Sequence, residues 1–210
     1  MLPGIIPVFP LPNVVLFPNV FLPLHIFEPR YRAMVAETLE GDRIIGMVLL
    51  QPGYESNYEG RPPVFSIGCA GVITHSEPLG DGRYNIVVRG LERFRITGED
   101  NAKAYRLATI DALPEEVPND HRDELRRHRH RLEALLAAAI ERTGSEPRFP
   151  AAVADEDLVN ALAQYVDLDP LERQALLEKN GVLARCRALI ELLEMRTLTP
   201  RHSWKGQSVH

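Results

Sequence analysis

The feature that most constrains this chain is its first stretch, which is rich in proline. Seven prolines fall within the first 29 residues, and large apolar residues separate them. Each proline fixes the backbone angle φ and removes one amide donor from the hydrogen-bond ladder. The stretch can therefore form neither a helix nor a central β-strand, and we expect edge strands, kinks and turns.

The apolar residues of this stretch need a surface to pack against. Residues 14–17 and 21–22 are too apolar for a solvated linker. Because most apolar residues of a soluble domain are packing residues, we expect most of them in a core. A second interpretation stays open, in which an edge strand carrying Phe17, Phe21 and Leu22 pairs with or cradles an extended hydrophobic peptide.

Composition and charge exclude several classes of protein. The chain has 210 residues, of which 45% are hydrophobic and 25% charged, which is typical of a soluble globular protein. Its net charge of -5 argues against non-specific binding to nucleic acid or to an anionic membrane. The longest apolar run, residues 44–50, is far too short to cross a bilayer, and the N-terminus lacks the basic region of a signal peptide. We therefore expect a cytoplasmic protein without membrane contact.

The cysteine pattern gives no sign of a disulfide framework or a metal site. Cys69 and Cys186 are far apart in the sequence, and both have apolar neighbours. Structural zinc sites commonly take ligands from closely spaced cysteines, and these two cysteines are far apart. The sequence therefore predicts two reduced, buried cysteines and neither a metal nor a cofactor.

The first half of the chain has the pattern of a β-rich domain with one short helix. Pro29 fits the first position of a helix that ends at Gly41. From residue 43 to 113, short apolar or alternating runs are separated by turn formers, which indicates strands of a meandering antiparallel barrel. Residues 84–88 and 92–97 are predicted as two separate strands, and Asp81–Arg83 as a hairpin turn.

The second half has the periodicity of helices. Pro114 and Pro118 mark a boundary, because neither can continue a strand. Four helices are predicted, starting near Asn119, Asp155, Asp169–Pro170 and Val182. The sequence thus predicts an α+β chain with a β-barrel domain at residues 1–113, a helical bundle at 119–196 and a disordered tail at 197–210.

Two groups of residues invite a chemical interpretation. His121, His128 and His130 lie among five arginines, but His130 points away from the other two on a helix and nearby acidic residues dilute the charge. A solvated helix face is the favoured interpretation. Cys69 has His75, Ser66 and Ser76 nearby in sequence, yet it lies between glycine and alanine in a predicted strand, a context without the cation that activates a thiolate. The sequence therefore predicts no catalytic residue. It also contains no Gly-x-x-x-x-Gly-Lys-[Ser/Thr] phosphate loop, so it cannot hold nucleotide phosphates in that manner.

Several motifs resemble those of one family, the Lon N-terminal or substrate-binding domain. Pro-Val-Phe-Pro-Leu-Pro-Asn-Val-Val-Leu-Phe-Pro at 7–18 and Leu-Pro-Leu-His-Ile-Phe-Glu-Pro-Arg-Tyr-Arg at 22–32 are similar to the opening of that family. The stretches 67–73 and 82–96 resemble family strands, and 180–194 resembles its last helix. The resemblance covers nearly the whole chain and implies a PUA-like pseudobarrel followed by a helical bundle.

The resemblance also implies a function without catalysis. Full Lon proteases carry an ATPase module and a Ser-Lys peptidase module after this domain, and cereblon-like relatives carry a cysteine-liganded zinc domain. None of these is found in the 210 residues. We expect a stand-alone, non-enzymatic domain, adaptor-like or chaperone-like, that captures unfolded or extended polypeptide segments and serves a separate protease or ATPase. The alternatives are a PUA-like RNA-binding module and an unrecognised hydrolase.

A second candidate surface is the long, turn-rich loop at residues 51–63. It carries Tyr54 and Tyr58, and tyrosine combines contact area with a hydrogen bond at low entropic cost. Loops on a rigid scaffold often carry recognition residues. The sequence therefore predicts Phe17, Phe21, Leu22, Tyr54 and Tyr58 as peptide-contacting residues and does not rank the loop against the edge strand.

Overall fold

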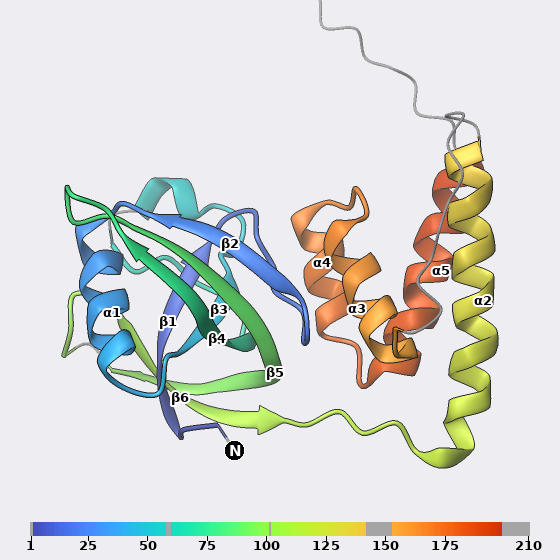
Figure 1. Cartoon of the computed structure of the whole chain (residues 1–210), viewed down its shortest axis with the longest axis horizontal. Helices are drawn as coiled ribbons and strands as arrows, with labels where there is room; N and C mark the ends of the chain where they lie inside the picture. The colour runs from blue at the N-terminus through green and yellow to red at the C-terminus, as the bar shows by residue number, and fades with distance from the viewer. Residues whose placement is uncertain (1, 58–59, 101, 142–152, 199–210) are drawn as a thin grey trace, which may run out of the picture.

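The computed structural model describes residues 2–57, 60–100, 102–141 and 153–198. Within these ranges the first half of the chain forms a six-stranded sheet with one helix, and the second half forms four helices beside it (Figure 1). We call residues 2–113 the sheet part and residues 119–198 the helical part. The architecture is mixed α/β.

The six strands follow an order that differs from their order in sequence. Along the sheet they run β2-β5-β4-β3-β1-β6, and β5 also pairs with β6. All pairings are antiparallel except that of β1 with β3. The pairings β2–β5, β1–β3 and β1–β6 join strands that are not consecutive in sequence, so the predicted meandering antiparallel order is wrong at these points. The bounds are β1 Ile5–Leu11, β2 Phe21–Ile26, β3 Ile44–Leu49, β4 Ile67–Pro78, β5 Tyr84–Asp100 and β6 Arg106–Leu113.

Strand β1 corrects the expectation that the proline-rich stretch forms edge strands alone, since β1 lies between β3 and β6. Its first half, with Pro7, pairs with β6, and its second half, with Pro10, pairs with β3. The two pairings overlap only at Val8. Each half of β1 thus forms a hydrogen-bond ladder with one neighbouring strand only. The proline of each half can face the other, unpaired side, where its missing N–H costs no ladder hydrogen bond. Strand β2, with Pro23, lies at the end of the sheet as predicted.

Strand β5 is one continuous strand, where the sequence predicted two at 84–88 and 92–97. It pairs with β2 over Tyr84–Arg89, with β4 over Tyr84–Arg95 and with β6 over Arg93–Asp100. The hairpin turn before it was predicted correctly: Gly82 has φ of +80° and its amide donates to the Leu79 carbonyl oxygen at 2.9 Å. A long strand with partners on both sides makes β5 the centre of the sheet part.

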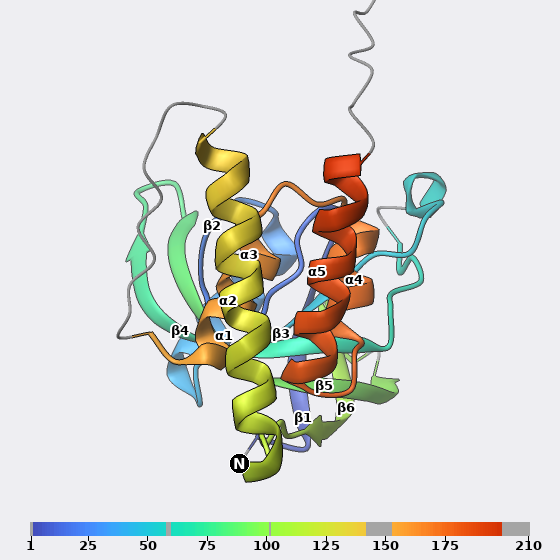
Figure 2. The same cartoon turned by 90° about the vertical axis from the view of Figure 1, so that its right-hand side faces the viewer.

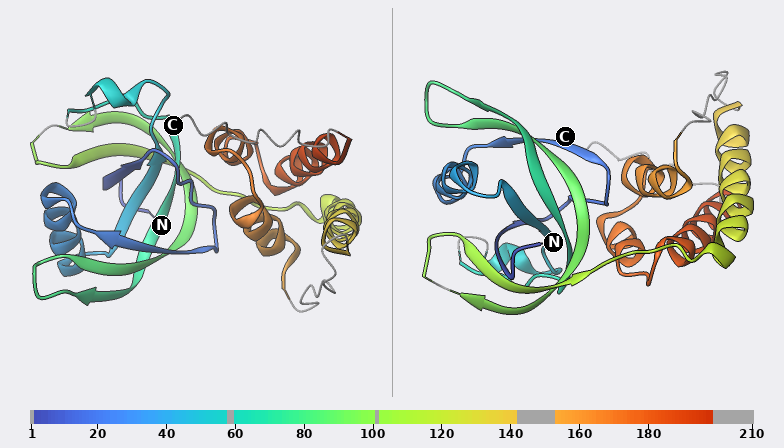
Figure 3. Two further views of the ribbon diagram at one scale, coloured as in Figure 1. Left: turned by 90° about the horizontal axis from the view of Figure 1, so that it is seen from above. Right: turned by 60° about the horizontal axis from the view of Figure 1, so that its bottom comes forward.

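Helix α1 (Pro29–Glu40) begins at Pro29, as the sequence predicted, and buries Tyr31, Met34 and Val35. A single turn of 3-10 helix, η1 (Tyr54–Asn57), lies in the loop between β3 and β4. Figure 3 shows η1 and β2 at opposite sides of the sheet part.

The helical part has two layers. Helices α3 (Asp155–Tyr165) and α4 (Pro170–Leu177) lie against the sheet part, and α2 (Asn119–Glu141) and α5 (Val182–Leu198) lie side by side behind them (Figures 1 and 2). The predicted start of α4 is confirmed, since Pro170 is its first residue and the Asp169 amide donates to Glu172 Oε2 at 2.8 Å. Helix α5 extends to Leu198, two residues into the predicted tail, and residues 199–210 lie outside the described ranges.

One cluster of buried apolar side chains runs through both parts. It includes Phe17, Met34 and Val88 from the sheet part and Val159 and Leu189 from the helical part. The two parts therefore fold against a shared core. The division into separate domains at 1–113 and 119–196 stays a prediction.

Candidate functional site

The loop between β1 and β2 connects the sheet part to α3. The Phe17 amide donates to Gln164 Oε1 at 3.3 Å, and Asn19 Nδ2 donates to Asp157 Oδ1 at 2.8 Å. On its other side, the Asn19 amide donates to the Gly90 carbonyl oxygen and the Gly90 amide to the Val20 carbonyl oxygen, both at 2.9 Å. Asn19 adopts φ of 60°, a left-handed conformation that asparagine tolerates better than most residues. The loop is thus clamped between β5 and α3.

Beneath this loop, three charged side chains from three segments form a buried cluster, the Arg93–Glu115–Arg185 cluster. Glu115 Oε1 lies 2.6 Å from Arg93 Nε on β5 and 2.5 Å from Arg185 Nη2 on α5. Arg185 is 0% exposed, and it also donates to Asn160 Oδ1 at 2.6 Å and to the Leu176 carbonyl oxygen at 3.2 Å. The cluster joins the sheet, the linker between β6 and α2, and the last helix.

The electrostatics of the cluster are those of a buried, nearly satisfied network. Burial lowers the pKa of Arg93, and the negative charge of Glu115 opposes that shift. Arg93 Nη1 also donates to the Leu177 carbonyl oxygen at 2.9 Å, and the Arg185 guanidinium lies 5.6 Å from the ring centroid of Phe17. Buried charges are tolerated only when pairing and hydrogen bonds offset their loss of water. The cluster therefore joins the helical part to the sheet part through buried ion pairs and hydrogen bonds.

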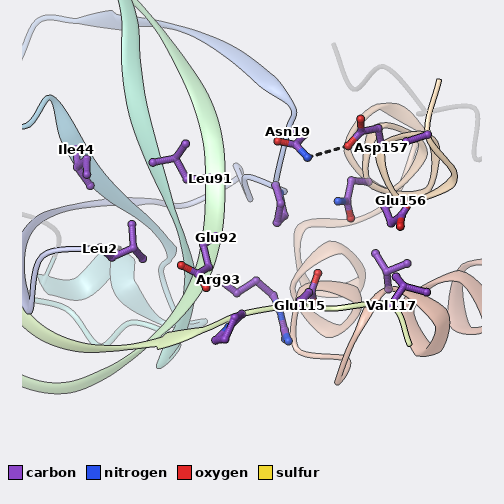
Figure 4. A pocket seen from close by; sticks show the side chains of 15 residues that line it. Leu2, Asn19, Ile44, Leu91, Glu92, Arg93, Glu115, Val117, Glu156 and Asp157 are labelled. Atoms are coloured by element: carbon purple, nitrogen blue, oxygen red, sulfur yellow. Dashed lines mark hydrogen bonds and ion pairs between the residues drawn. The ribbon is translucent and has the colours of Figure 1, made fainter. Parts of the chain in front are cut away.

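A cleft opens beside the cluster, between β5 and α3 (Figure 4). Its volume is about 760 Å³, within the range of roughly 300–1,000 Å³ that ligand pockets occupy. Apolar side chains form much of its wall, and four acidic residues and one arginine lie among them. The lining consists of Leu2, Pro18, Asn19, Ile44, Leu91, Glu92, Arg93, Pro114, Glu115, Val117, Ala154, Glu156, Asp157, Asn160 and Val182.

A second candidate surface follows β2. Phe21 is 51% exposed, Phe27 60% and Tyr165 66%, and the Tyr165 hydroxyl donates to the Phe21 carbonyl oxygen at 2.9 Å. Pro23 and His25 lie between the two phenylalanines and are also exposed. We call these five residues the β2 surface. A shallow groove of about 340 Å³, lined in part by Pro23, His25 and Val87, lies next to it.

The backbone of β2 has one open side. Residues of the same parity in a strand direct their amide and carbonyl groups to the same neighbour. The Val20 carbonyl faces β5, whereas the Phe21 carbonyl faces Tyr165. Phe21, Pro23 and His25 therefore direct their backbone groups away from β5, toward the end of the sheet. Proline in this register loses no ladder hydrogen bond to β5.

The structure separates the residues that the sequence predicted as peptide contacts. Phe21 is exposed on the β2 surface, and Leu22 next to it is half-buried against the core. Phe17 is fully buried, which corrects the prediction of a surface contact: its side chain packs in the core beside Arg185. Tyr54 lies on η1, away from β2, and Tyr58 lies outside the described residues.

The histidine and arginine stretch is largely the solvated helix face that the sequence predicted, except that Arg129 is only 7% exposed and is paired with Glu133 and Asp155. His128 lies 3.5 Å from Glu124, and His130 lies 3.3 Å from Glu133. Three arginines of the same helix form ion pairs with carboxylates of α2, α3 or α5, and Arg126 and Arg127 are exposed. Within the described ranges, no group of three His, Cys, Asp or Glu side chains has the arrangement of a metal site. The same charges give the RNA-binding alternative little support.

The nucleophile candidates do not come together. Cys69 is fully buried, whereas His75 is exposed on the same strand. Burial raises the pKa of Cys69 to about 12, and burial raises that of Cys186 to about 12 as well. Both thiols therefore stay protonated at neutral pH, as the sequence predicted for buried, reduced cysteines.

Thiol labelling at pH 8 tests this assignment. Because thiolate is the reactive form, neither cysteine should react with Ellman's reagent in the native protein over an hour, and both should react once urea is added. The released thionitrobenzoate is read by absorbance. A thiol that reacts within minutes, while circular dichroism shows the native fold, would contradict the burial of that cysteine.

The chain is thus a domain with a mixed α/β sheet part, a docked helical part and a cleft between them. The sequence matches the ATP-dependent protease La (LON) substrate-binding domain over residues 5–195. The chain belongs to this family.

Individual relatives agree with that membership. The chain is 28% identical over 203 residues to Lon protease 2 of Myxococcus xanthus and 26% identical over 203 residues to the Lon protease of Anaeromyxobacter dehalogenans. Each match covers 93% of this chain and 24% of the relative, so the chain spans about a quarter of their length.

Solved structures show the same fold. The N-terminal domain of Mycobacterium avium complex Lon protease superposes with a TM-score of 0.64 at 20% identity, over 91% of this chain and 99% of that one. A Lon N-terminal domain protein from Xanthomonas campestris superposes with a TM-score of 0.60 at 22% identity, over 90% of this chain and 97% of that one.

Across the described ranges, none of the helices is long and apolar enough to cross a membrane.

Proposed function

We propose that the chain recognises extended, apolar polypeptide segments and that the β2 surface makes the contact. Membership in a substrate-binding domain family supports polypeptide recognition. The observation that carries the finer proposal is the grouping of Phe21, Phe27 and Tyr165 beside the open side of β2. Large apolar side chains that stay exposed together on a soluble domain commonly mark an interaction surface.

The geometry supports a mode of binding in which side-chain contacts dominate. The open side of β2 offers the amides of Phe21 and His25 and the carbonyls of Pro23 and His25, because proline has no amide and Tyr165 already engages the Phe21 carbonyl. An added strand would gain a few backbone hydrogen bonds. The aromatic rings would supply most of the buried area.

The finer fold label and the wider role of the chain are also proposals. A PUA-like pseudobarrel, an adaptor or chaperone activity without ATP, delivery to a separate protease or ATPase, and a cytoplasmic location stay proposals. Tyr54 and Leu22 stay in the proposed contact set, Tyr54 as a separate position on the other side of the sheet part.

Replacing Phe21 by serine tests the β2 surface. The affinity for a fluorescent, unfolded polypeptide should fall roughly tenfold, because a buried aromatic anchor typically contributes about 1–2 kcal/mol or more to an interface. Fluorescence anisotropy measures the affinity. Because Phe21 is half exposed in the free protein, the melting temperature should change little.

Leu171→Ser is the matched control. Leu171 is 50% exposed on α4, so the substitution removes a similar apolar surface outside the β2 surface. Its affinity should equal that of the unchanged protein. An equal loss in both variants, or no loss with Phe21→Ser, would remove the β2 surface from the proposal.

A further inference from the structure

A row of hydrogen-bonded polar side chains reaches the β2 surface and ends at the ring of His25. The hairpin between β4 and β5 lies beside this end of β2, because Tyr84 at the start of β5 pairs with Ile26 (Figure 1). Asn85 Oδ1 lies 2.8 Å from His25 Nδ1, and Arg83 Nη1 lies 3.5 Å from His25 Nε2. Both ring nitrogens of this exposed histidine therefore have a defined partner.

These partners determine which nitrogen of the His25 ring carries the proton. The Asn85 amide is oriented by Glu77, because Asn85 Nδ2 donates to Glu77 Oε2 at 3.0 Å and an ionised carboxylate only accepts. Asn85 therefore turns its oxygen toward His25, and Nδ1 of the ring donates to it. Arg83 can only donate, so Nε2 of the ring accepts. The neutral ring with its proton on Nδ1 is the form that makes both hydrogen bonds.

Arg83 stays in place over the pH range in which histidine side chains titrate. Its Nε donates to Asp81 Oδ2 at 2.5 Å, and its Nη2 lies 2.5 Å from the same oxygen. Hydrogen bonds from the side chain and the amide of Arg83 lower the pKa of Asp81 to about 2, so this carboxylate stays charged well below neutral pH. Further titratable or charged side chains at this end of the sheet are His75 and Glu77 on β4, Tyr84 on β5, Arg32 of α1 beside Gly82, and the ion pair of Glu28 with Arg30.

Protonation of His25 is incompatible with this arrangement at Nε2. The added proton points at Arg83 Nη1, which is itself a donor and part of a cation. The hydrogen bond is lost, and two positive groups then face each other. Histidine is the side chain whose charge ordinarily changes between about pH 5 and pH 8. The contact between His25 and Arg83 therefore depends on pH in this range.

The His25 ring is also part of the surface that a bound segment covers. It is exposed between Pro23 and Phe27, and its centroid lies 6.2 Å from that of the Phe27 ring, with the two planes inclined at 25°. An apolar segment on the β2 surface removes water from this ring. The loss of water costs much more for a charged imidazole than for a neutral one whose nitrogens keep protein partners. The attraction of a charged ring to Phe27 is weak at an exposed site and does not replace that water.

We propose that His25 makes binding at the β2 surface dependent on pH, so that extended apolar segments bind when the ring is neutral and are released when it is protonated. The inference rests on the proposed function and adds the regulation of that site. The sign follows from linkage: the segment prefers the form with one proton fewer, so its affinity falls as the pH falls. By the same linkage, a bound segment makes His25 harder to protonate.

One short apolar peptide tests the proposal with the full chain at pH 8 and at pH 5.5. Its ends are capped, it has no titratable side chain, and its fluorescent label is insensitive to pH. An ordinary imidazole is about nine-tenths protonated at pH 5.5, so the affinity should fall by roughly five- to tenfold from pH 8. Fluorescence anisotropy gives the affinities, and circular dichroism checks that the fold is the same at both pH values.

Variants connect the change in affinity to the ring. His25→Gln keeps a neutral side chain throughout and should bind about equally at both pH values. His75→Gln is the matched control, because His75 is exposed, lines the same groove and is not part of the hydrogen-bonded row. This control should keep the full pH dependence. Arg83→Gln removes the cation that faces Nε2 and should move the fall in affinity to higher pH.

Nitrogen NMR of the His25 ring gives a readout that needs no variant. The unchanged protein should show the tautomer with its proton on Nδ1 at pH 8, and saturating peptide should move the titration of the ring to lower pH. A role of His25 in folding alone predicts no such shift. If His25→Gln binds the peptide at neither pH, this titration and Arg83→Gln decide.

The outcomes separate this inference from the proposed function. Equal affinity of the unchanged protein at both pH values, a pH dependence that survives in His25→Gln, or a ring titration that the peptide does not move overturns the inference and leaves polypeptide recognition standing. No binding of the peptide at either pH, together with none of unfolded polypeptides, overturns the proposed function as well.

Discussion

Replacing Arg185 by alanine should lower the free energy of unfolding by about 3–5 kcal/mol, which is the cost of breaking a buried ion pair by removing one partner. Arg185 is fully buried, and it serves Glu115, Asn160 and the Leu176 carbonyl together. Its loss leaves Asn160 and one side of Glu115 without a partner in a place that water reaches poorly. Urea denaturation followed by circular dichroism measures the change, provided that the transition stays two-state.

Arg187→Ala provides the matched control on the same helix. Arg187 is half exposed, and its carboxylate partner Glu124 lies at the surface. Exposed ion pairs typically contribute no more than about 1 kcal/mol, so this variant should unfold close to the unchanged protein. A loss below about 1 kcal/mol for Arg185→Ala, or equal losses for the two variants, would show that the cluster does not hold the helical part in place.

Helix starts and turns could be predicted from the sequence because local chemistry decides them. Pro29 and Pro170 each begin a helix, and Gly82 takes the positive φ that its turn requires. Such signals need only neighbouring residues. The prolines of β1 were misread because local signals do not show partner strands. Their place inside the sheet depends on β3 and β6, each of which pairs with one half of β1.

The buried cluster could not be predicted, because its members come from distant parts of the chain. Arg185 and Glu115 are 70 residues apart, and Arg93 comes from a third segment, strand β5. One local signal was present. Arg185 lies three residues after Val182 and four before Leu189, both buried, so helical spacing places it on the apolar side of α5. A charged residue at such a position indicates a buried partner.

The candidate site could be predicted only in part for a related reason. Phe17 and Phe21 come from one apolar stretch and have the same residue type, yet one is buried and the other is half exposed. The difference is set by where α3 meets the loop, through Gln164, Asp157 and Tyr165. The cleft likewise forms only when β5 and α3 face each other, so a lining that comes from distant segments of the chain has no local signature.

Replacing Gly90 by alanine should cost about 3 kcal/mol of unfolding free energy, at the upper end of what overpacking a core usually costs. Gly90 lies in the middle of β5, where the loop at Phe17–Val20 crosses it. An added Cβ would meet the Phe17 carbonyl oxygen and carbon far inside van der Waals distance. These are backbone atoms. They are held in place by the hydrogen bond from the Phe17 amide to Gln164 and by the two backbone hydrogen bonds that Gly90 forms with residues 19 and 20. The loop must move, and with it the start of the β2 surface, so polypeptide binding should weaken together with stability.

Gly98→Ala, on the same strand, separates this clash from a general effect of alanine in β5. At Gly98 the nearest atoms to an added Cβ are those of the Thr109 side chain at 3.9 Å, an ordinary contact. Its stability should be unchanged or higher by about 0.5 kcal/mol, because alanine has less freedom than glycine in the unfolded chain. Urea denaturation compares the two variants, and anisotropy compares their binding. Equal stability of Gly90→Ala and Gly98→Ala would mean that the loop is not clamped between β5 and α3. Full binding by a destabilised Gly90→Ala would show that the position of the loop does not determine the β2 surface.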